Sequence, residues 1–276
     1  MPTFAQRLLG LLLATLAAGA PAAMLAPTDD PQASAVWQKV RASLFENRVI
    51  NAATPEQLTL EAPARAINAA VVPIAIRPGT LVTPERHVRR LYLVIDANPS
   101  PISAIFQFTP DSGRADIETR VRVDEYSHVR AIAEMSDGQL YATTRFVKAS
   151  GGCSAAPASD AAAALATLGR MSFQVEGDLN GREPVAAQLL IDHPNHSGLA
   201  MDQASRQYTP AHFVRKVDVS YAGRPVLSAD VDFSISENPY FRFYFAPRGA
   251  GELSASVTDS RELRFDASQA LRAAPR

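Results

Sequence analysis

The sequence DIETRVRVDEYSHVRAIAEMSDGQLYATTRFV, residues 116–147, decides the fold class. It holds three strand-like runs, at 116–123, 129–135 and 140–147. The first alternates apolar and polar residues, which is the pattern of a half-buried β-strand. The pair Asp137-Gly138 between the second and third runs is typical of a tight hairpin turn. Strands and turns at this spacing predict an antiparallel β-sandwich.

Strand-like runs continue on both sides of this stretch. They cover residues 58–63, 71–76, 89–96 and 102–109 before it, and 172–175, 185–191, 213–220, 226–231, 241–245 and 251–257 after it. Pro73 interrupts one run, which predicts a position at a sheet edge or a bulge. One amphipathic helix is expected at 35–45. The sequence therefore predicts an all-β protein of two β-sandwiches.

The single cysteine of the chain, Cys153, lies between the two predicted sandwiches and follows Gly151 and Gly152 directly. One thiol cannot form an internal disulfide. Glycine removes the steric barriers that restrict the backbone, and residues 149–160 are too small or polar to bury a side chain. The pattern predicts an exposed thiol on a flexible arm. The alternative is a small buried apolar residue, a common role for free cysteine.

An Ala-rich segment of small residues, 154–168, separates the two halves. A chain of 29.6 kDa is long enough for two domains of ordinary size, each with its own core. We expect the first domain at residues 30–149, the cysteine arm and linker at 150–168, and the second domain at 169–267.

The N-terminus has the features of a secretory signal peptide. Arg7 precedes the apolar run 8–18, and small residues follow it as far as Ala23. The run is shorter than the ~20 apolar residues that span a membrane. The sequence predicts a signal peptide at 1–23 and an exported mature protein without a membrane span. The net charge of −1 offers no basic surplus for a phosphate backbone, so nucleic acid is not an expected partner.

No catalytic or metal-binding motif emerges from the residues. His193 and His196 lie three apart, but Pro194 argues against a helix and no second ligand pair is evident, so a loop-shaping role is expected rather than a metal site. Asp124 and Glu125 are interpreted as solvated rather than as an acid/base pair. A Gly-rich phosphate loop and a Gly-x-Ser-x-Gly elbow are both absent from the sequence. The remaining histidines stand alone in the sequence: His87, His128 and His212.

Both halves resemble a known two-subunit carrier. The first half resembles the Y subunit of SoxYZ, the sulfur-oxidation carrier, at residues 119–124, 129–138 and Gly151-Gly152-Cys153. The second half resembles the Z subunit at residues 192–194, 198–199, 223–226 and 238–240. The two patterns occur in order around the cysteine. The combination resembles the fused SoxYZ-like carrier family associated with quinoprotein dehydrogenases.

This resemblance implies an immunoglobulin-like first domain, a fibronectin-III-like second domain, a periplasmic location and a carrier rather than an enzyme. Cys153 would be the covalent attachment point for a sulfur-containing intermediate, and Gly151 and Gly152 would give the arm its flexibility. The implied partners are periplasmic redox enzymes, either of the Sox type or a PQQ-dependent dehydrogenase or cytochrome, and no cofactor is expected.

One departure from the pattern concerns the arm. In the Y subunit the arm is a free C-terminus, whereas here Cys153 is followed by a whole domain. An alternative function is therefore a non-covalent docking module for an exported quinoprotein dehydrogenase or its cytochrome. Cys153 also allows a disulfide-linked dimer.

Overall fold

The computed structural model describes residues 30–79, 85–158, 160–202 and 205–272. The predicted signal peptide at 1–23 lies outside these ranges. Within them, no helix has both the length and the apolar composition needed to cross a membrane.

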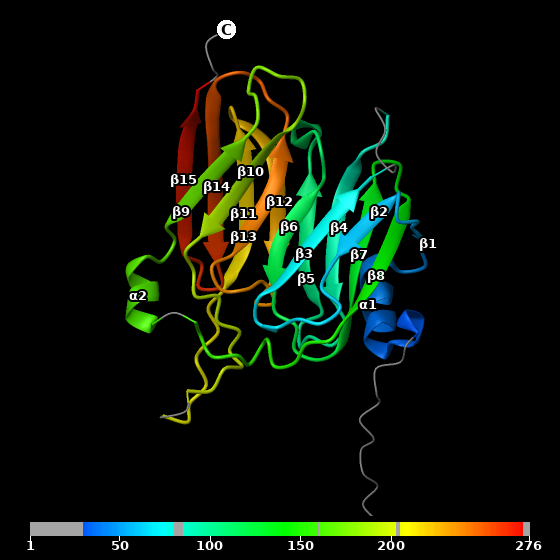
Figure 1. The fold of residues 1–276 in the computed structure, drawn as a ribbon, viewed down its shortest axis with the longest axis vertical. Helices are drawn as coiled ribbons and strands as arrows, with labels where there is room; N and C mark the ends of the chain where they lie inside the picture. Colours follow the sequence, from blue (N-terminus) through cyan, green and yellow to red (C-terminus); the bar gives the residue numbers. More distant parts are fainter. Residues whose placement is uncertain (1–29, 80–84, 159, 203–204, 273–276) are drawn as a thin grey trace, which may run out of the picture.

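Two β-sheets pack face to face around the core (Figure 1). The nine-stranded sheet contains, in spatial order, β1 (Ile50–Ala52), β8 (Leu140–Val147), β7 (Ser127–Met135), β4 (Val88–Ile95), β5 (Ile102–Phe108), β12 (Arg224–Val231), β11 (Val214–Tyr221), β14 (Gly251–Asp259) and β15 (Arg264–Leu271). The six-stranded sheet contains β2 (Leu58–Glu61), β3 (Val72–Pro78), β6 (Ile117–Val121), β13 (Tyr240–Phe245), β10 (Val185–Ile191) and β9 (Met171–Glu176). The all-β prediction is confirmed.

Both sheets run across the boundary between the two halves of the chain. β5 pairs antiparallel with β12 over Ala104–Phe108, and β6 pairs antiparallel with β13. One continuous apolar cluster fills the space between the sheets, and Phe106 of the first half meets Phe241 of the second with ring centroids 6.1 Å apart. The halves are therefore joined by strand pairing and a shared core as well as by the linker.

The predicted helix is α1 (Ala35–Phe45). Its N-cap is Ser34, whose hydroxyl accepts a hydrogen bond from the Trp37 amide and so satisfies a donor at the helix start. The buried face of α1 covers the outer face of the nine-stranded sheet over the first half; the buried residues of this cluster are Trp37, Val40, Phe45, Tyr92, Val94, Ile132 and Leu140. The shorter helical segments are η1 (Pro31–Ala33), η2 (Pro110–Ser112) and α2 (Ala161–Ala166).

Pro73 occupies a locally open edge, as its sequence context predicts. β2 pairs with β3 only from Ala75 to Pro78, so among the described strands none pairs with that side of β3 at Pro73. A residue without an amide hydrogen costs no ladder hydrogen bond at such a position. Two strands were not predicted from the sequence: β1 is only three residues long, and β15 is an edge strand with one buried residue, Leu271.

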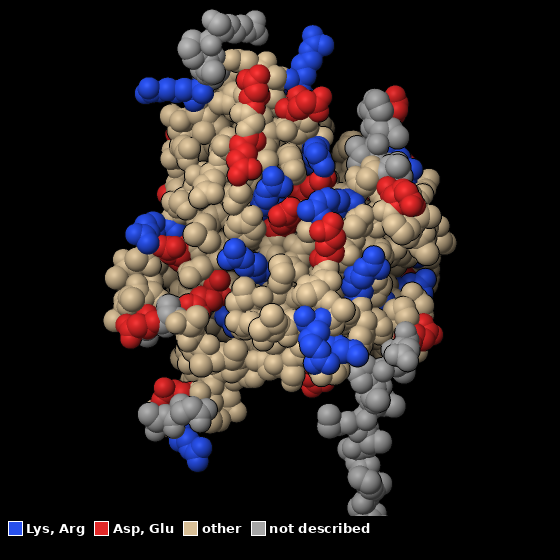
Figure 2. All heavy atoms as spheres, viewed as in Figure 1, with Lys and Arg blue, Asp and Glu red and all other residues tan. Residues whose placement is uncertain are grey.

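Basic and acidic side chains are interspersed over the face of the six-stranded sheet (Figure 2). Glu118 of β6 lies within ion-pair distance of Arg77 and Arg242, at 2.8 and 3.5 Å, and Arg77 also meets Glu61 at 2.6 Å. Because these charges pair with one another, the described residues of this face form no extended patch of one sign.

Candidate functional site

The cysteine segment, residues 149–158, carries Cys153. It follows β8 and crosses the end of the sandwich from the first half toward α2 (Figure 1). The Cys153 amide donates to Asp124 Oδ1 at 3.1 Å, and the Ser197 hydroxyl donates to the Cys153 carbonyl at 2.5 Å. Cys153 has a relative exposure of 0%. The expectation of an exposed thiol is therefore wrong for this conformation, because residues distant in sequence bury the thiol where its own neighbours are too small to do so.

The two glycines before Cys153 have packing roles in this structure. Gly151 has a left-handed backbone with φ of +77° and donates to the Asp124 carbonyl at 2.6 Å. Gly152 donates to the Val123 carbonyl at 3.1 Å. A Cβ atom on Gly152 would lie 2.2 Å from the Ala69 carbonyl oxygen and 2.6 Å from that of Val123. Only glycine fits so close an approach to the backbone; a further role in arm flexibility stays a prediction.

Arg122 connects the cysteine segment to both halves. It is 4% exposed, and its guanidinium donates to the Gly152 carbonyl at 3.3 Å and to the Asn195 carbonyl at 3.2 Å. The third nitrogen, Nε, is buried without a hydrogen-bond partner. Burial lowers the pKa of Arg122, while Cys153 and Glu237 act in the opposite direction. The role of Arg122 was not predicted from the sequence, because nothing local distinguishes Arg122 from its exposed neighbour Arg120.

The surroundings of the thiol keep it protonated. Burial raises the pKa of Cys153 to about 12, the carboxylate of Asp124 adds to the rise, and Arg122 opposes it. Asp124 was interpreted as solvated, but it lies beside the thiol and holds the Cys153 amide. Since the thiolate is the nucleophile, the closed segment holds Cys153 in an unreactive form at neutral pH.

The loop at 193–197 forms the wall of the site that the second half contributes. The Asn195 side chain donates to the Ile235 carbonyl at 2.7 Å and accepts from the Val214 amide at 2.8 Å. The Asn195 amide donates to His193 Nδ1 at 3.1 Å, and the His193 amide donates to Asn238 Oδ1 at the same distance. His193 thus shapes the loop that receives the cysteine segment, in agreement with the role expected for it.

His193, His212 and Asp259 form a buried cluster that their separation in sequence concealed. Their ligand-type atoms lie within 4.8 Å of one another, and Asp259 Oδ2 lies 2.7 Å from His212 Nε2 and 3.5 Å from His193 Nε2. His193 Nδ1 accepts the Asn195 amide, which leaves the ring proton on Nε2. A metal ligand needs a lone pair on Nε2 and donates through its other nitrogen. The cluster is therefore better described as His212 hydrogen-bonded to Asp259, with His193 Nε2 lying 3.5 Å from the same carboxylate and without a hydrogen bond among the described residues, than as a metal centre.

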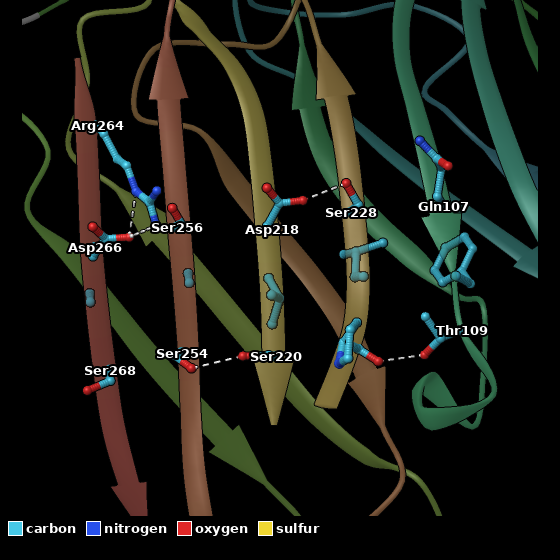
Figure 3. Close-up of a pocket in the computed structure, with 16 residues that line it drawn as sticks. Gln107, Thr109, Asp218, Ser220, Ser228, Ser254, Ser256, Arg264, Asp266 and Ser268 are labelled. Carbon is cyan, nitrogen blue, oxygen red and sulfur yellow. Dashed lines mark hydrogen bonds and ion pairs between the residues drawn. The ribbon is translucent and has the colours of Figure 1, made fainter. Parts of the chain in front are cut away.

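An open groove of about 780 Å³ lies on the outer face of the nine-stranded sheet, over the strands of the second half and the end of β5 in the first (Figure 3). Its polar side chains pair with one another: Ser220 with Ser254 at 3.0 Å, and Ser228 with Asp218 at 2.7 Å. None of the residues that hold the Cys153 segment lines it. The Ser228 hydroxyl has a carboxylate beside it, but the residues that line the groove include no histidine, lysine or cysteine, so Cys153 remains the better candidate for covalent chemistry.

Two family models match the chain in tandem. The model of the sulfur oxidation protein SoxY matches residues 41–153 and so ends on Cys153, and the model of the sulphur oxidation protein SoxZ matches residues 176–270. No curated protein matches the chain at a significant level.

Several solved structures are similar to parts of the chain. The sulfur carrier protein SoxY from Chlorobium limicola f thiosulfatophilum is 23% identical with a TM-score of 0.35, and the match covers 41% of this chain and 94% of that one. A superoxide reductase (neelaredoxin) from Ignicoccus hospitalis is 14% identical with a TM-score of 0.31, covering 36% and 94%. The fibronectin(III)-like modules of CbhA from Clostridium thermocellum are 13% identical with a TM-score of 0.23, covering 78% and 93%. Because the two family models lie in tandem on the two halves of one continuous sandwich, the chain belongs to the SoxY and SoxZ families and is a fused SoxYZ-like protein.

Proposed function

We propose that the protein is a periplasmic carrier that holds a sulfur-containing intermediate covalently on Cys153 Sγ and presents it to Sox-type or other redox enzymes. It performs no turnover of its own. The observation that supports this most directly is the SoxY match, which ends on the one thiol of the chain with the SoxZ match following. Cys153 lies where residues of both matched regions meet, since Asp124 and Ser197 both form hydrogen bonds with its backbone.

Attachment of the intermediate to Cys153 and its delivery to a partner enzyme both require the cysteine segment to leave its buried site. The contacts that hold it are hydrogen bonds that the segment donates to Val123 and Asp124, the hydrogen bond that it accepts from Ser197, and the burial of one thiol. Each such hydrogen bond has a net contribution of about 0.5–1.5 kcal/mol. Neither sheet includes the segment, so it can open while the strand pairing stays intact. The carrier then alternates between a closed form with a protected thiol and an open form that reacts.

Intact-mass analysis of protein isolated from its native host tests this function. We expect an adduct that reductant removes and that peptide mapping places on Cys153, and we expect a Cys153→Ser variant to lack it. The mature N-terminus, read in the same spectra, tests the export that the predicted signal peptide at 1–23 requires. Absence of any adduct under several growth conditions would overturn the carrier function.

A second candidate is a non-covalent docking module for an exported quinoprotein dehydrogenase or its cytochrome. The burial of Cys153, which raises the pKa of its thiol to about 12, favours this candidate, because a function without covalent chemistry needs no accessible thiol. Full support of dehydrogenase activity by Cys153→Ser would select the docking module over the carrier. A disulfide-linked dimer through Cys153 would need the same opening of the segment, and mobility on a non-reducing gel measures it directly.

A further inference from the structure

Arg122 is a buried cation for which the described part of the chain provides no paired anion. The other deeply buried arginine, Arg130, shows how this fold normally satisfies such a group: it pairs with both carboxylate oxygens of Asp96, at 2.7 and 2.5 Å, and lies over the Trp37 ring. Arg122 has two backbone carbonyls and, among the described residues, no carboxylate within ion-pair distance. A buried charge that lacks a counter-ion is costly, so the site is electrostatically incomplete as it stands.

The missing charge is expected beside Cys153. The Arg122 guanidinium contacts the carbonyl of Gly152, the residue directly before the cysteine. Its Nε–H is a buried donor that has no acceptor. Asp124 and Asp232 raise the pKa of the thiol and Arg122 lowers it, with Asp124 acting more strongly than Arg122. The charge that would pair with Arg122 therefore belongs on the outer atoms of a group attached to Sγ and not on Sγ itself. His196 and Glu237 complete the ionisable groups that interact with Arg122.

We propose that Arg122 is the counter-charge for an anionic group carried on Cys153 Sγ, and that it makes the closed segment favour anionic adducts over neutral ones. The proposal rests on the carrier function above and names the residue that recognises the cargo. A sulfonate or persulfide on Sγ brings a negative charge and an acceptor for the Nε–H. Charge-assisted hydrogen bonds of this kind are about twice as strong as neutral ones. A neutral adduct leaves Arg122 unpaired.

The two kinds of adduct can be installed chemically on the purified protein. Tetrathionate reacts with the thiolate to give Sγ–S–SO₃⁻ on Cys153 and thiosulfate, and sulfite then displaces a second thiosulfate to leave the S-sulfonate, Sγ–SO₃⁻. Methyl methanethiosulfonate reacts with the thiolate to give the neutral methyl disulfide, Sγ–SCH₃, and methanesulfinate. Intact mass confirms each product before the midpoint of thermal unfolding, Tm, is measured.

We expect the S-sulfonate form of the unmutated protein to melt above the methyl disulfide form by roughly 2–4 °C, the shift that one modest interaction produces in a chain of this size. In Arg122→Gln the difference should vanish or reverse. Arg120→Gln is the matched control, because Arg120 lies two residues away on the same stretch, is exposed, and covers the Tyr240 ring. Arg120→Gln loses the same charge and should keep the Tm difference between the S-sulfonate and methyl disulfide forms.

A Tm difference between the two adducts that persists unchanged in Arg122→Gln would overturn the proposal. Failure of the unmutated protein to form either adduct would overturn it as well. Should Arg122→Gln fail to fold, Arg122→Lys takes its place. Lysine lacks the Nε donor, so the difference must shrink, and an undiminished difference overturns the role of Arg122. Because the adducts are installed chemically, failure here leaves the native-host mass result untouched, and the two failures can be told apart.

Discussion

The Ser197 hydroxyl donates to the Cys153 carbonyl at 2.5 Å and so ties the second half of the chain to the last residue of the SoxY match. Ser197 is buried and belongs to the loop that His193 and Asn195 shape. This bond differs from those of Val123 and Asp124, which lie in the same half as the cysteine segment. The second half thus helps to keep the thiol closed.

Removing this hydroxyl should open the segment more often. We expect Ser197→Ala to increase the rate at which a maleimide labels Cys153 by about 2- to 10-fold, which corresponds to the net worth of one hydrogen bond. The labelling rate reports the open population when opening is fast compared with the reaction. Ser220→Ala, which removes a hydroxyl paired with Ser254 in the groove, is the control and should label at the unmutated rate. Equal rates in both variants would show that Ser197 does not restrain the segment.

Gly152→Ala should have a larger effect on the same measurement. The added methyl group would meet the Ala69 carbonyl oxygen at 2.2 Å, a distance that real Cβ contacts do not show, so the segment must move away. We expect labelling to rise more than about 10-fold while circular dichroism shows intact strands, because the lost contacts are several hydrogen bonds and neither sheet includes the segment. Gly181→Ala, whose nearest contact would be 3.1 Å, is the matched control. A protected thiol in Gly152→Ala would contradict the closed packing described here.

Acid should weaken the fold through His193. Burial, with a smaller contribution from His212, lowers the pKa of His193 to about 4 from its ordinary value of 6.5. Between these values the unfolded chain binds a proton that the folded chain does not, so the free energy of unfolding falls as the pH falls. This stability is fully present above pH 6.5 and is lost as the pH drops toward 4.

The measurement is Tm as a function of pH in the unmutated protein and in His193→Gln, which cannot titrate. The slope between pH 6.5 and 4 should be smaller in the variant. His87→Gln, at an exposed position, should retain the full slope. Identical slopes in all three proteins would mean that His193 is not the group responsible.

The fold was largely predictable because most strands carry their own signal. The alternation in residues 116–123 and the turn at Asp137-Gly138 are local, and so is the spacing of Trp37 and Val40 in α1. The strands β1 and β15 were missed for the same reason, since a strand of three residues or one with a single buried side chain has no periodic pattern. What no local pattern can reveal is that β5 pairs with β12 across the boundary between the halves.

The site was predictable in its cysteine but not in its environment. Cys153 and the two glycines stand out in sequence, yet the thiol is buried, and the Cys153 backbone is held by Asp124 and by Ser197, the latter more than 40 residues downstream. Arg122 carries no local signal, because its alternating neighbours look equally suited to solvent. Burial of a thiol among small residues depends on which distant loops fold over it, and a single sequence does not contain that information in readable form.

The two halves should unfold together, because both sheets and the core run across their boundary. Trp37 is the only tryptophan and lies in the first half, so its fluorescence reports that half alone. Phe241→Ala removes a buried ring of the second half that packs edge-to-face on Phe106. Large-to-small changes of this kind cost about 3–5 kcal/mol.

We expect Phe241→Ala to lower the midpoint seen by Trp37 fluorescence as much as the one seen by circular dichroism. In two independently folding domains the fluorescence midpoint would stay where it was, and circular dichroism would show two transitions. Leu165→Ala, an exposed change in α2, is the control and should leave both midpoints unchanged. Coincident shifts in Phe241→Ala would mean that the two halves form one cooperative unit and that the cysteine segment opens on this intact scaffold. The hydrogen bond from Ser197 and the charge of Arg122 would then both act on the same folded, closed state.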